Sequence, residues 1–423
     1  NQNFVDRYGF GNDTGFDSLD PVWMPRLGLT YDLDDFAVFS RSKLHGGIGM
    51  FSGGDPVVWF GNAFQNDGRG YAQGSTQDAP CPAGQIDVVV DGKFTGVPGC
   101  FKSAGVAIAA AGKGDTQSVD PDIKMPSVLR ANFGISSDLN FADSGFFSGW
   151  KVAVDYIYSH YMNPFNIVDL SMVPNIAKGL NGYTIDGRPI YAAIDPTVAG
   201  CDATLTTVHP KPTYNNVTAA CFATSRDDEL MLTNTSSYDS HVASFILSKD
   251  FNGGIFTSGG ETSFTFGYSS TNAQDRRSMY NSTAGSNYDN VAAFDRQNPA
   301  ASPSFYASKH NFTLNTSFRE EFFKDLDTRL GITFVARSGR PYSLTFGGSG
   351  VWGDSVSGSD NALVYLPTGL SDPNVSPSST ISADKMAELV SWIDSTSCAK
   401  KYIGSTVPRN TCTGDWYFDM DLT

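Results

Sequence analysis

The sequence lacks any long hydrophobic run. Its longest candidate, GVAIAAAG at residues 105–112, is short and interrupted by glycine, whereas a membrane-spanning helix needs about 20 predominantly apolar residues in succession. A helical membrane protein is therefore excluded. A transmembrane β-barrel remains open, because its strands place apolar side chains only at alternate positions and leave the mean hydropathy close to that of a soluble protein.

Positive charge is also scarce. The 423 residues contain 29 Lys and Arg against 44 Asp and Glu, which gives a net charge of −15. A nucleic-acid-binding surface needs clustered Lys and Arg to replace the counterions of the phosphates, so we exclude nucleic acid as a partner. Charged residues amount to only 17% and glycines number 43, a mixture that favours strands and loops.

Signatures of catalysis and of cofactor binding are missing. The sequence has no H-E-x-x-H motif and no G-x-S-x-G serine elbow, and its five histidines are scattered. The stretch GGIGMFSGG at 46–54 resembles a phosphate-binding loop only loosely, because no lysine follows it. We therefore predict that the protein is not an enzyme, with no catalytic residue, no metal site and no cofactor, although aspartate pairs for glycoside hydrolysis cannot be selected from a sequence.

The cysteines do not form a C-x-x-C pair, which disfavours zinc and redox sites. They fall instead into three local couples separated by 19, 20 and 14 residues: Cys81 with Cys100, Cys201 with Cys221, and Cys398 with Cys412. An even number in local couples predicts loop-closing disulfides in an oxidising compartment, with free thiols as the alternative. Each bridge would stabilise its loop by roughly 3 kcal/mol.

What the sequence does contain is alternation with a period of two. Between residues 150 and 158, Trp150, Val152, Val154, Tyr156 and Tyr158 alternate with smaller or charged residues. The same alternation recurs within residues 26–33, 43–50, 129–135, 243–247, 264–268, 312–318, 330–334 and 416–423. This pattern predicts nine β-strands.

The connections between these strands alternate in length. Short links at 32–37, 140–145, 250–254 and 324–327 alternate with long ones at about 52–124, 162–228, 271–307 and 347–413. A transmembrane barrel explains this alternation, since tight turns lie at one rim and elaborate loops at the other. We predict an all-β fold, an antiparallel transmembrane β-barrel, whose long extracellular loops have no core of their own and carry the disulfides. A sheet that covers a soluble core would show the same period.

The alternation also assigns side chains to the two faces. The segment from Trp150 to Tyr158 would cover roughly 20 Å of membrane, so its apolar side is expected to contact lipid. Trp150 would then lie at one interface, and Tyr156 and Tyr158 at the other. We predict that residues on the opposite side of the strands face a lumen, although each could equally be an ordinary solvated barrel residue. They are Arg26, Asp32, Lys43, His45, Arg130, Asn132, Lys151 and Asp155.

The last long connection contains a helical pattern. Ser382 is a candidate N-cap, and Met386, Leu389, Val390 and Ile393 share one face of the predicted helix. Amphipathic faces are usually buried, so we interpret the helix as a packing element of this loop, with a partner-binding helix as the alternative.

Several stretches together resemble TonB-dependent outer-membrane receptors, and most closely the Oar-like branch with a carboxypeptidase-regulatory-like domain. They are MPRLGLTYDL (24–33), LHGGIGMFSGGDPVVW (44–59), KHNFTLNTSF (309–318), RSGRPYSLTF (337–346), DNALVYLPTG (360–369) and RNTCTGDWYFDMDLT (409–423). The resemblance covers most of the chain and rests on strand and turn motifs. It implies a 22-stranded barrel with an internal plug, a TonB box that engages the TonB–ExbB–ExbD motor, and uptake of a bulky ligand.

The sequence departs from this family in ways that limit what carries over. No plug, TonB box or terminal aromatic signal is recognised, and Thr423 falls within a strand pattern. The resemblance therefore implies that residues 1–423 are one barrel segment with long loops, without the plug and the final strands. We expect a protein of the Gram-negative outer membrane that binds an unknown external ligand, with surface partner proteins as a variant. A passive porin-like channel and a secreted soluble β-rich binding or carbohydrate-active protein are the alternatives.

Overall fold

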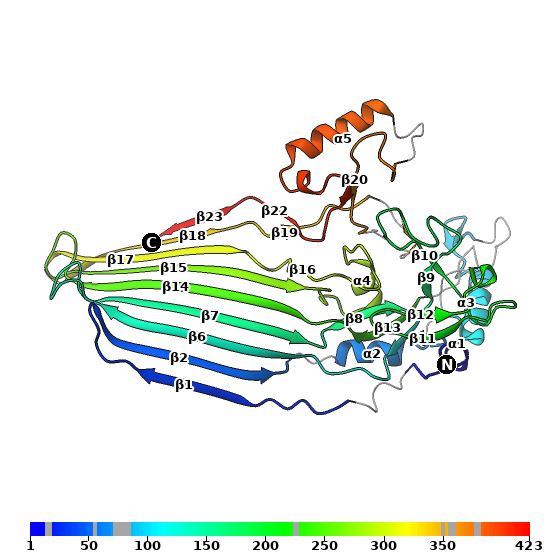
Figure 1. Cartoon of the computed structure of the whole chain (residues 1–423), viewed down its shortest axis with the longest axis horizontal. Helices are drawn as coiled ribbons and strands as arrows, with labels where there is room; N and C mark the ends of the chain where they lie inside the picture. The colour runs from blue at the N-terminus through cyan, green and yellow to red at the C-terminus, as the bar shows by residue number, and fades with distance from the viewer. Residues whose placement is uncertain are drawn as a thin grey trace.

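The computed structural model combines one large sheet with a body of packed loops at one end of it (Figure 1). It describes residues 1–12, 19–53, 57–70, 86–222, 228–347, 352–353, 361–375 and 382–423. None of the helices in these ranges is long and apolar enough to cross a membrane.

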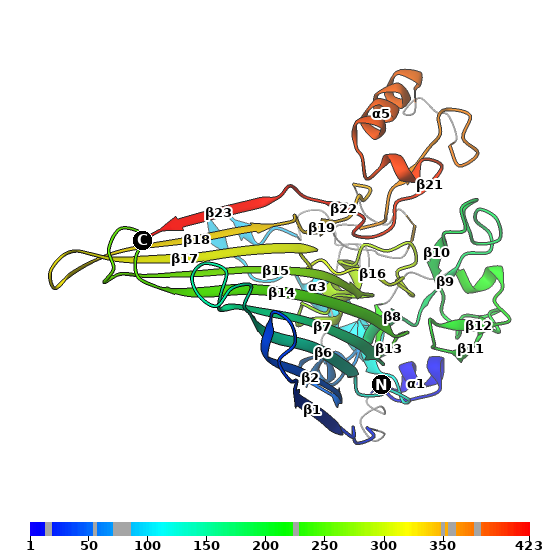
Figure 2. The same cartoon turned by 60° about the vertical axis from the view of Figure 1, so that its left-hand side comes forward.

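The large sheet contains the nine predicted strands, each antiparallel to the next. In spatial order they are β1 (Arg26–Asp32), β2 (Phe39–Phe51), β6 (Ser127–Leu139), β7 (Trp150–Met162), β14 (Tyr238–Asn252), β15 (Glu261–Asp275), β17 (His310–Phe323), β18 (Leu326–Arg337) and β23 (Tyr417–Leu422), with the short β16 (Ser302–Pro303) beside β15. The edge strands β1 and β23 lie at opposite margins in both views (Figure 1 and Figure 2). Over the residues that the structure describes, the sheet is therefore open, and a closed barrel of 22 strands is not observed.

The strands are long enough to cross a membrane. The central strands β14 and β15 have 15 residues each, which corresponds to about 50 Å of chain and, at a tilt of about 40°, to roughly 38 Å along the membrane normal. An apolar band of about 25 Å in height fits within this length.

The register places most of the large apolar side chains of the nine strands on one face. One row of paired residues crosses the whole sheet: Tyr31, Leu44, Ile135, Val154, Phe245, Tyr268, Phe312, Ala336 and Phe418. The adjacent row is almost entirely polar: Thr30, His45, Gly134, Asp155, Ser244, Ser269, Asn311, Arg337 and Tyr417. We refer to these two sides as the apolar face and the polar face.

Much of the apolar face is open. Phe133 is 56% exposed, Tyr156 44% and Phe418 64%. An exposed apolar surface that runs across nine strands is far larger than soluble monomers tolerate. Its size is a first structural indication of a membrane protein.

The two ends of the sheet differ, as the connection lengths predict. Tight turns join β1 to β2, β6 to β7, β14 to β15 and β17 to β18 at the turn end. The described parts of the long connections 52–126, 163–237, 276–309 and 338–416 lie at the loop end (Figure 1).

The long connections form a body with a core, so the expectation of loops without a core is wrong. Its centre is a sheet in which β13 (Glu229–Asn234) runs parallel to β5 (Thr116–Val119) and antiparallel to β8 (Phe165–Asp169). Helices α2 (Val57–Gln65) and α4 (Ala284–Asp289) pack on one side of it. Helix α1 (Gln2–Tyr8) packs on the other side. These elements come from the N-terminal segment and from three different connections, which is why no single loop shows the pattern of a domain.

Smaller elements complete this loop body. They are β3 (Val89–Val90), β4 (Lys93–Phe94), α3 (Gly99–Ala111), β9 (Met172–Pro174), β10 (Tyr191–Ala193), β11 (Thr204–Thr207), β12 (Thr213–Asn215) and the 3₁₀ helix η2 (Ala219–Phe222).

The last connection has its own cluster of buried residues. It contains β19 (Pro341–Tyr342), β20 (Tyr365–Leu366), α5 (Ala383–Ser395), the 3₁₀ helix η3 (Lys400–Tyr402), β21 (Ser405–Thr406) and β22 (Cys412–Thr413). The predicted helix is confirmed, because the Ser382 side chain accepts a hydrogen bond from the backbone N–H of Lys385 and caps α5. Ile393 of α5 packs against Leu366 and Val407.

Candidate functional site

All eight residues predicted to line a lumen lie on the polar face. The paired registers of β1, β2, β6 and β7 place them there: Arg26, Asp32, Lys43, His45, Arg130, Asn132, Lys151 and Asp155. Trp150, Tyr156 and Tyr158 lie on the apolar face by the same registers. Which side contacts lipid and which lines a lumen stays a prediction from the alternation.

A histidine and an aspartate meet on the polar face, over strand β6. His45 on β2 and Asp155 on β7 are two strands apart, yet His45 Nε2 lies 2.7 Å from Asp155 Oδ1. Gly134 of β6 lies between them, and a Cβ at this position would come within 2.2 Å of Asp155 Oδ1 and 2.4 Å of His45 Nε2. The missing side chain of Gly134 is therefore what allows the pair to form. Both side chains are about one-third exposed, so a polar ligand can reach them.

Cross-strand ion pairs follow the turn end of the polar face. Lys43 pairs with Asp32 at 3.6 Å and Lys151 with Asp250 at 3.4 Å. Further along, Arg319 bridges Glu261 and Asp327, at 3.3 and 3.4 Å. Exposed pairs contribute little stability, typically below about 1 kcal/mol each. Their effect is to place opposite charges next to each other on neighbouring strands at the turn end.

Two adjoining cavities of about 480 and 460 Å³ lie where the polar face meets the loop body. They share Ser278, Tyr280 and Tyr306, and we call them together the mouth groove. Its other aromatic lining residues are Trp59, Tyr161, Phe165, Tyr238 and Phe305. Tyr161 and Tyr238 stack with ring centroids 4.8 Å apart, whereas Tyr280 and Tyr306 are 58% and 60% exposed. Exposed rings beside half-buried ones form a surface on which a ligand can stack.

Buried polar groups hold the floor of the mouth groove. The guanidinium of Arg277 donates to Asn166 Oδ1 at 2.7 Å and to the carbonyl of Arg296 at 2.6 Å. Burial lowers the pKa of Arg277 to about 9. Arg409 reaches from the last connection to pair with Asp275 at the end of β15. These bonds join separate connections, so the groove is fixed by the loop body as a whole.

A third cavity of about 350 Å³ lies between the connection 163–237 and the connection that carries α5. It is lined mainly by Phe346, Trp352, Tyr365, Met386 and Leu389. The guanidinium of Arg188 lies over the Trp352 ring at 4.7 Å and donates to the carbonyl of Leu363 at 2.6 Å.

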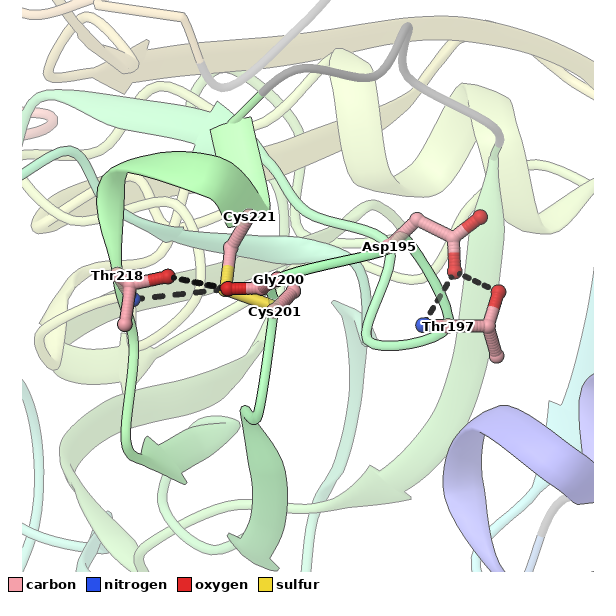
Figure 3. Close-up of a disulfide and its surroundings, with 6 residues drawn as sticks. All are labelled: Asp195, Thr197, Gly200, Cys201, Thr218 and Cys221. Atoms are coloured by element: carbon pink, nitrogen blue, oxygen red, sulfur yellow. Dashed lines mark hydrogen bonds between the residues drawn. A yellow bond between two sulfur atoms is a disulfide. The ribbon is translucent and has the colours of Figure 1, made fainter.

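Two of the three predicted disulfides are present in the loop body. Cys201 and Cys221 are bonded, and Thr218 lies beside the Sγ atom of Cys221 (Figure 3). Cys398 and Cys412 close the last connection after α5. Cys81, the predicted partner of Cys100, lies outside the described residues. In the turn that precedes Cys201, the Asp195 carboxylate accepts hydrogen bonds from the backbone N–H and the hydroxyl of Thr197 (Figure 3). These bonds stabilise the turn.

A second histidine–aspartate pair lies within the loop body. His209 Nε2 is 2.8 Å from Asp120 Oδ2, which also accepts a hydrogen bond from the Thr233 hydroxyl. The bond to Asp120 raises the pKa of His209 above its usual value of 6.5. Burial alone would raise the pKa of Asp120, but the hydrogen bonds from His209 and Thr233 outweigh it and lower that pKa below 3.8.

The sequence did not reveal the mouth groove. Trp59, Tyr161, Tyr280 and Tyr306 come from different parts of the chain and share no spacing, and the only available signal was an aromatic content of 13%. Nothing in the described ranges brings three or more His, Cys, Asp or Glu side chains together as metal ligands.

Comparison with known proteins agrees with this architecture. A family model for an outer membrane beta barrel domain matches residues 2–423. No curated protein and no solved structure matches the chain. The match spans the exposed apolar face, the polar face and the loop body together, and it sets aside a secreted soluble protein. The chain therefore belongs to the outer membrane β-barrel domain family and is a protein of the bacterial outer membrane.

Proposed function

We propose that the chain forms the wall and the external loops of a TonB-dependent transporter of the Oar-like branch, which captures a bulky ligand outside the cell. The observation that carries this proposal is the mouth groove, which lies where the polar face meets a loop body with its own core. A simple pore has no need of such a body, whereas a receptor needs a rigid surface that holds its ligand.

The mechanism is binding and transport, without bond chemistry. The ligand first stacks on exposed rings of the mouth groove, such as Tyr280 and Tyr306. It then passes along the polar face, where the His45–Asp155 pair and the neighbouring Asn132 offer hydrogen bonds. The TonB–ExbB–ExbD motor, acting through a plug as in the receptors that the sequence resembles, supplies the energy.

The same proposal orients the protein in the membrane. The apolar face, with Trp150, Tyr156 and Tyr158, contacts lipid, and the loop end faces the exterior. Tyr156 and Tyr158 lie nearer the loop end of β7 and Trp150 at its turn end, so these rings mark the two interfaces.

A passive porin-like channel is the second candidate. Several positions on the polar face of β1, β2 and β6 are glycines, namely Gly28, Gly47, Gly49 and Gly134. Small side chains on this face leave room for a water-filled lumen, which a porin requires.

Single-channel recording of the full-length protein in planar bilayers distinguishes the two candidates. A plugged transporter is expected to show no stable conductance, and the purified protein is expected to bind the periplasmic domain of TonB. A stable open conductance without TonB binding would favour the porin. Tyr280→Ala combined with Tyr306→Ala should abolish TonB-dependent uptake, while Val106→Ala, which removes a 60% exposed side chain from α3, should leave it unchanged.

A further inference from the structure

The tight turns at the turn end carry exposed apolar side chains. We call this set the turn belt, and its members are between 51% and 76% exposed: Phe36, Phe141, Phe146, Phe147, Ile255, Phe256, Phe322 and Phe323. Turns that face water are usually built from Gly, Asn, Asp, Ser and Pro. The turn between β14 and β15 has glycine, asparagine and serine, as such turns usually do, but between 251 and 260 it has no charged residue and carries Phe251, Ile255 and Phe256.

A lysine side chain binds the backbone of the turn between β6 and β7. Lys249 lies on the apolar face of β14 and is only 5% exposed. Its ammonium donates to the carbonyls of Gly145 and Phe146 at 2.6 and 2.9 Å and also to that of Ser148. All three of its protons are therefore used. The ring of Phe251 lies 4.6 Å from the same nitrogen, which adds a cation–π contact.

A glutamate binds the turn between β14 and β15, and it accepts hydrogen bonds from backbone N–H groups where the lysine donates to carbonyls. Glu320 of β17 is also 5% exposed and lies on the apolar face. Its carboxylate accepts from the backbone N–H groups of Ile255, Phe256 and Thr257, the last at 2.9 Å, and from the Thr257 hydroxyl at 2.7 Å. A Cβ on Gly254 would come within 2.1 Å of this carboxylate, so the glycine is needed for the close approach.

These two side chains replace the water that turn backbones normally bind. A backbone N–H or C=O that enters hydrocarbon without a partner costs several kcal/mol. Lys249 satisfies three carbonyls of one turn, and Glu320 satisfies three N–H groups of the other. Each charge is buried by the turn that it holds. Both turns can therefore leave bulk water without exposing these groups.

The turn belt is also continuous with the apolar face. Phe146 contacts Trp150 and Phe251 with ring centroids 5.6 and 5.7 Å apart. Trp150 in turn contacts Phe264 of β15 at 5.7 Å. An unbroken aromatic surface thus runs from the strands onto the turn, and an outer-membrane protein of this family meets lipid with its apolar surface.

We propose that the turn belt docks into the phospholipid surface of the leaflet opposite to the loops, so that the tips of these turns lie at the boundary between headgroups and acyl chains. The charges of Lys249 and Glu320 keep the immersed turns folded. This inference goes beyond ligand uptake: it depends on the outer-membrane location and holds for a transporter and for a passive channel alike.

Depth-dependent fluorescence quenching tests the proposal. The described part of the chain has no free cysteine, so Phe256→Cys in the full-length protein can be labelled with a small fluorophore after reconstitution into phospholipid vesicles. Ile185→Cys is the matched control, because this residue is apolar and 54% exposed but belongs to the loop body. We expect lipid brominated near the headgroup to quench the label at 256 by at least half, and aqueous iodide to quench only the label at 185.

Quenching of the label at 256 by iodide but not by brominated lipid would overturn the proposal and would place the tips in water, free for a periplasmic protein. Phe147→Cys, in the neighbouring turn, is read in the same way if Phe256→Cys fails to fold.

The role of the carboxylate is tested separately. Glu320→Gln puts an amide where three N–H groups converge, so lipid quenching at 256 should fall by at least half. Glu261→Gln removes an exposed carboxylate at the same end of the polar face and should leave the quenching unchanged. Equal quenching in both variants would exclude Glu320 as the group that keeps this turn in lipid.

Discussion

At the scale of single residues, several contacts depend on the absence of a side chain. His45 and Asp155 meet only because Gly134 has none, and Glu320 approaches its turn closely because of Gly254. Glycine in a strand interior normally weakens it and often marks a close approach of other groups. Gly134 is such a glycine within β6 and makes room for the His45–Asp155 pair, whereas Gly254 lies in the turn after β14 and makes room for the Glu320 carboxylate.

Substitution of Gly134 should separate the histidine from the aspartate. Gly134→Ala places a methyl group between the two side chains, and we expect a loss of about 1–3 kcal/mol in the free energy of unfolding from overpacking and the lost hydrogen bond. Gly28→Ala is the control, because a Cβ there meets only a carbonyl oxygen at 3.8 Å. Urea unfolding in vesicles measures both variants, and equal stabilities would contradict the assignment.

The pair of Asp120 and His209 should make the loop body sensitive to pH. The raised pKa of His209 gives a stabilisation that is fully present below about pH 6.5 and is lost as the pH rises through its folded value. The lowered pKa of Asp120 gives a stabilisation that is present above about pH 3.8 and is lost as the pH falls through its folded value. The loop body should therefore be most stable between these limits.

Limited proteolysis at about pH 5.5 and about pH 8.5 measures this dependence. The wild-type loop body should be cleaved faster at the higher pH, and His209→Asn should remove the difference. A difference that persists in His209→Asn would assign the sensitivity to another group.

At the scale of elements, strand β13 organises the loop body. All six of its residues are buried, and it pairs with β5 on one side and β8 on the other. Leu230 packs towards α2 and α4, whereas Met231 packs towards α1. Because successive side chains of β13 point to opposite sides, this strand contributes to the hydrophobic clusters on both sides of its sheet. This is expected for a strand that is covered on both faces.

Truncation within β13 should loosen the loop body and spare the large sheet. Met231→Ala removes a fully buried side chain, for which we expect a loss of about 2–5 kcal/mol. Faster cleavage of the connections by protease, with an unchanged migration of the unheated protein on a gel, is the expected result. Val106→Ala should change neither property, and unfolding of the whole protein by Met231→Ala would show that sheet and loop body form one cooperative unit.

At the scale of the whole molecule, the sheet divides its surroundings into two environments. Phe245 and Ser244 are consecutive residues of β14, but their paired rows lie on opposite faces. We expect a charge at the first position to enter lipid and a charge at the second to enter a polar lumen.

This division predicts unequal effects of the same substitution. Phe245→Lys should destabilise the protein by about 2–4 kcal/mol in a bilayer, as expected for a charged side chain near the membrane midplane. Ser244→Lys, which lies beside Asp155, should be nearly neutral. Unfolding in vesicles measures both, and the reverse order would show that the apolar face does not contact lipid.

The sequence by itself determined what depends on neighbours along the chain. Period-two alternation identified the nine strands and assigned Trp150 and Asp155 to opposite faces, because successive side chains of a strand point to opposite sides. The Ser382 cap and the couple of Cys201 with Cys221 are equally local signals. The resemblance to outer-membrane receptors agreed with the coarser family that matches the chain.

Only the tertiary structure decided what depends on residues far apart in the chain. The indole of Trp59 donates to the carbonyl of Asn281 across 222 positions, and Gln297 holds the backbone of Asp169 across 128. Such contacts built the core of the loop body and the mouth groove, and contacts of the same kind placed Glu320 beneath its turn. A periodic pattern carries no information about which distant segment a strand or loop will contact, so these sites form only when the strands and loops are assembled.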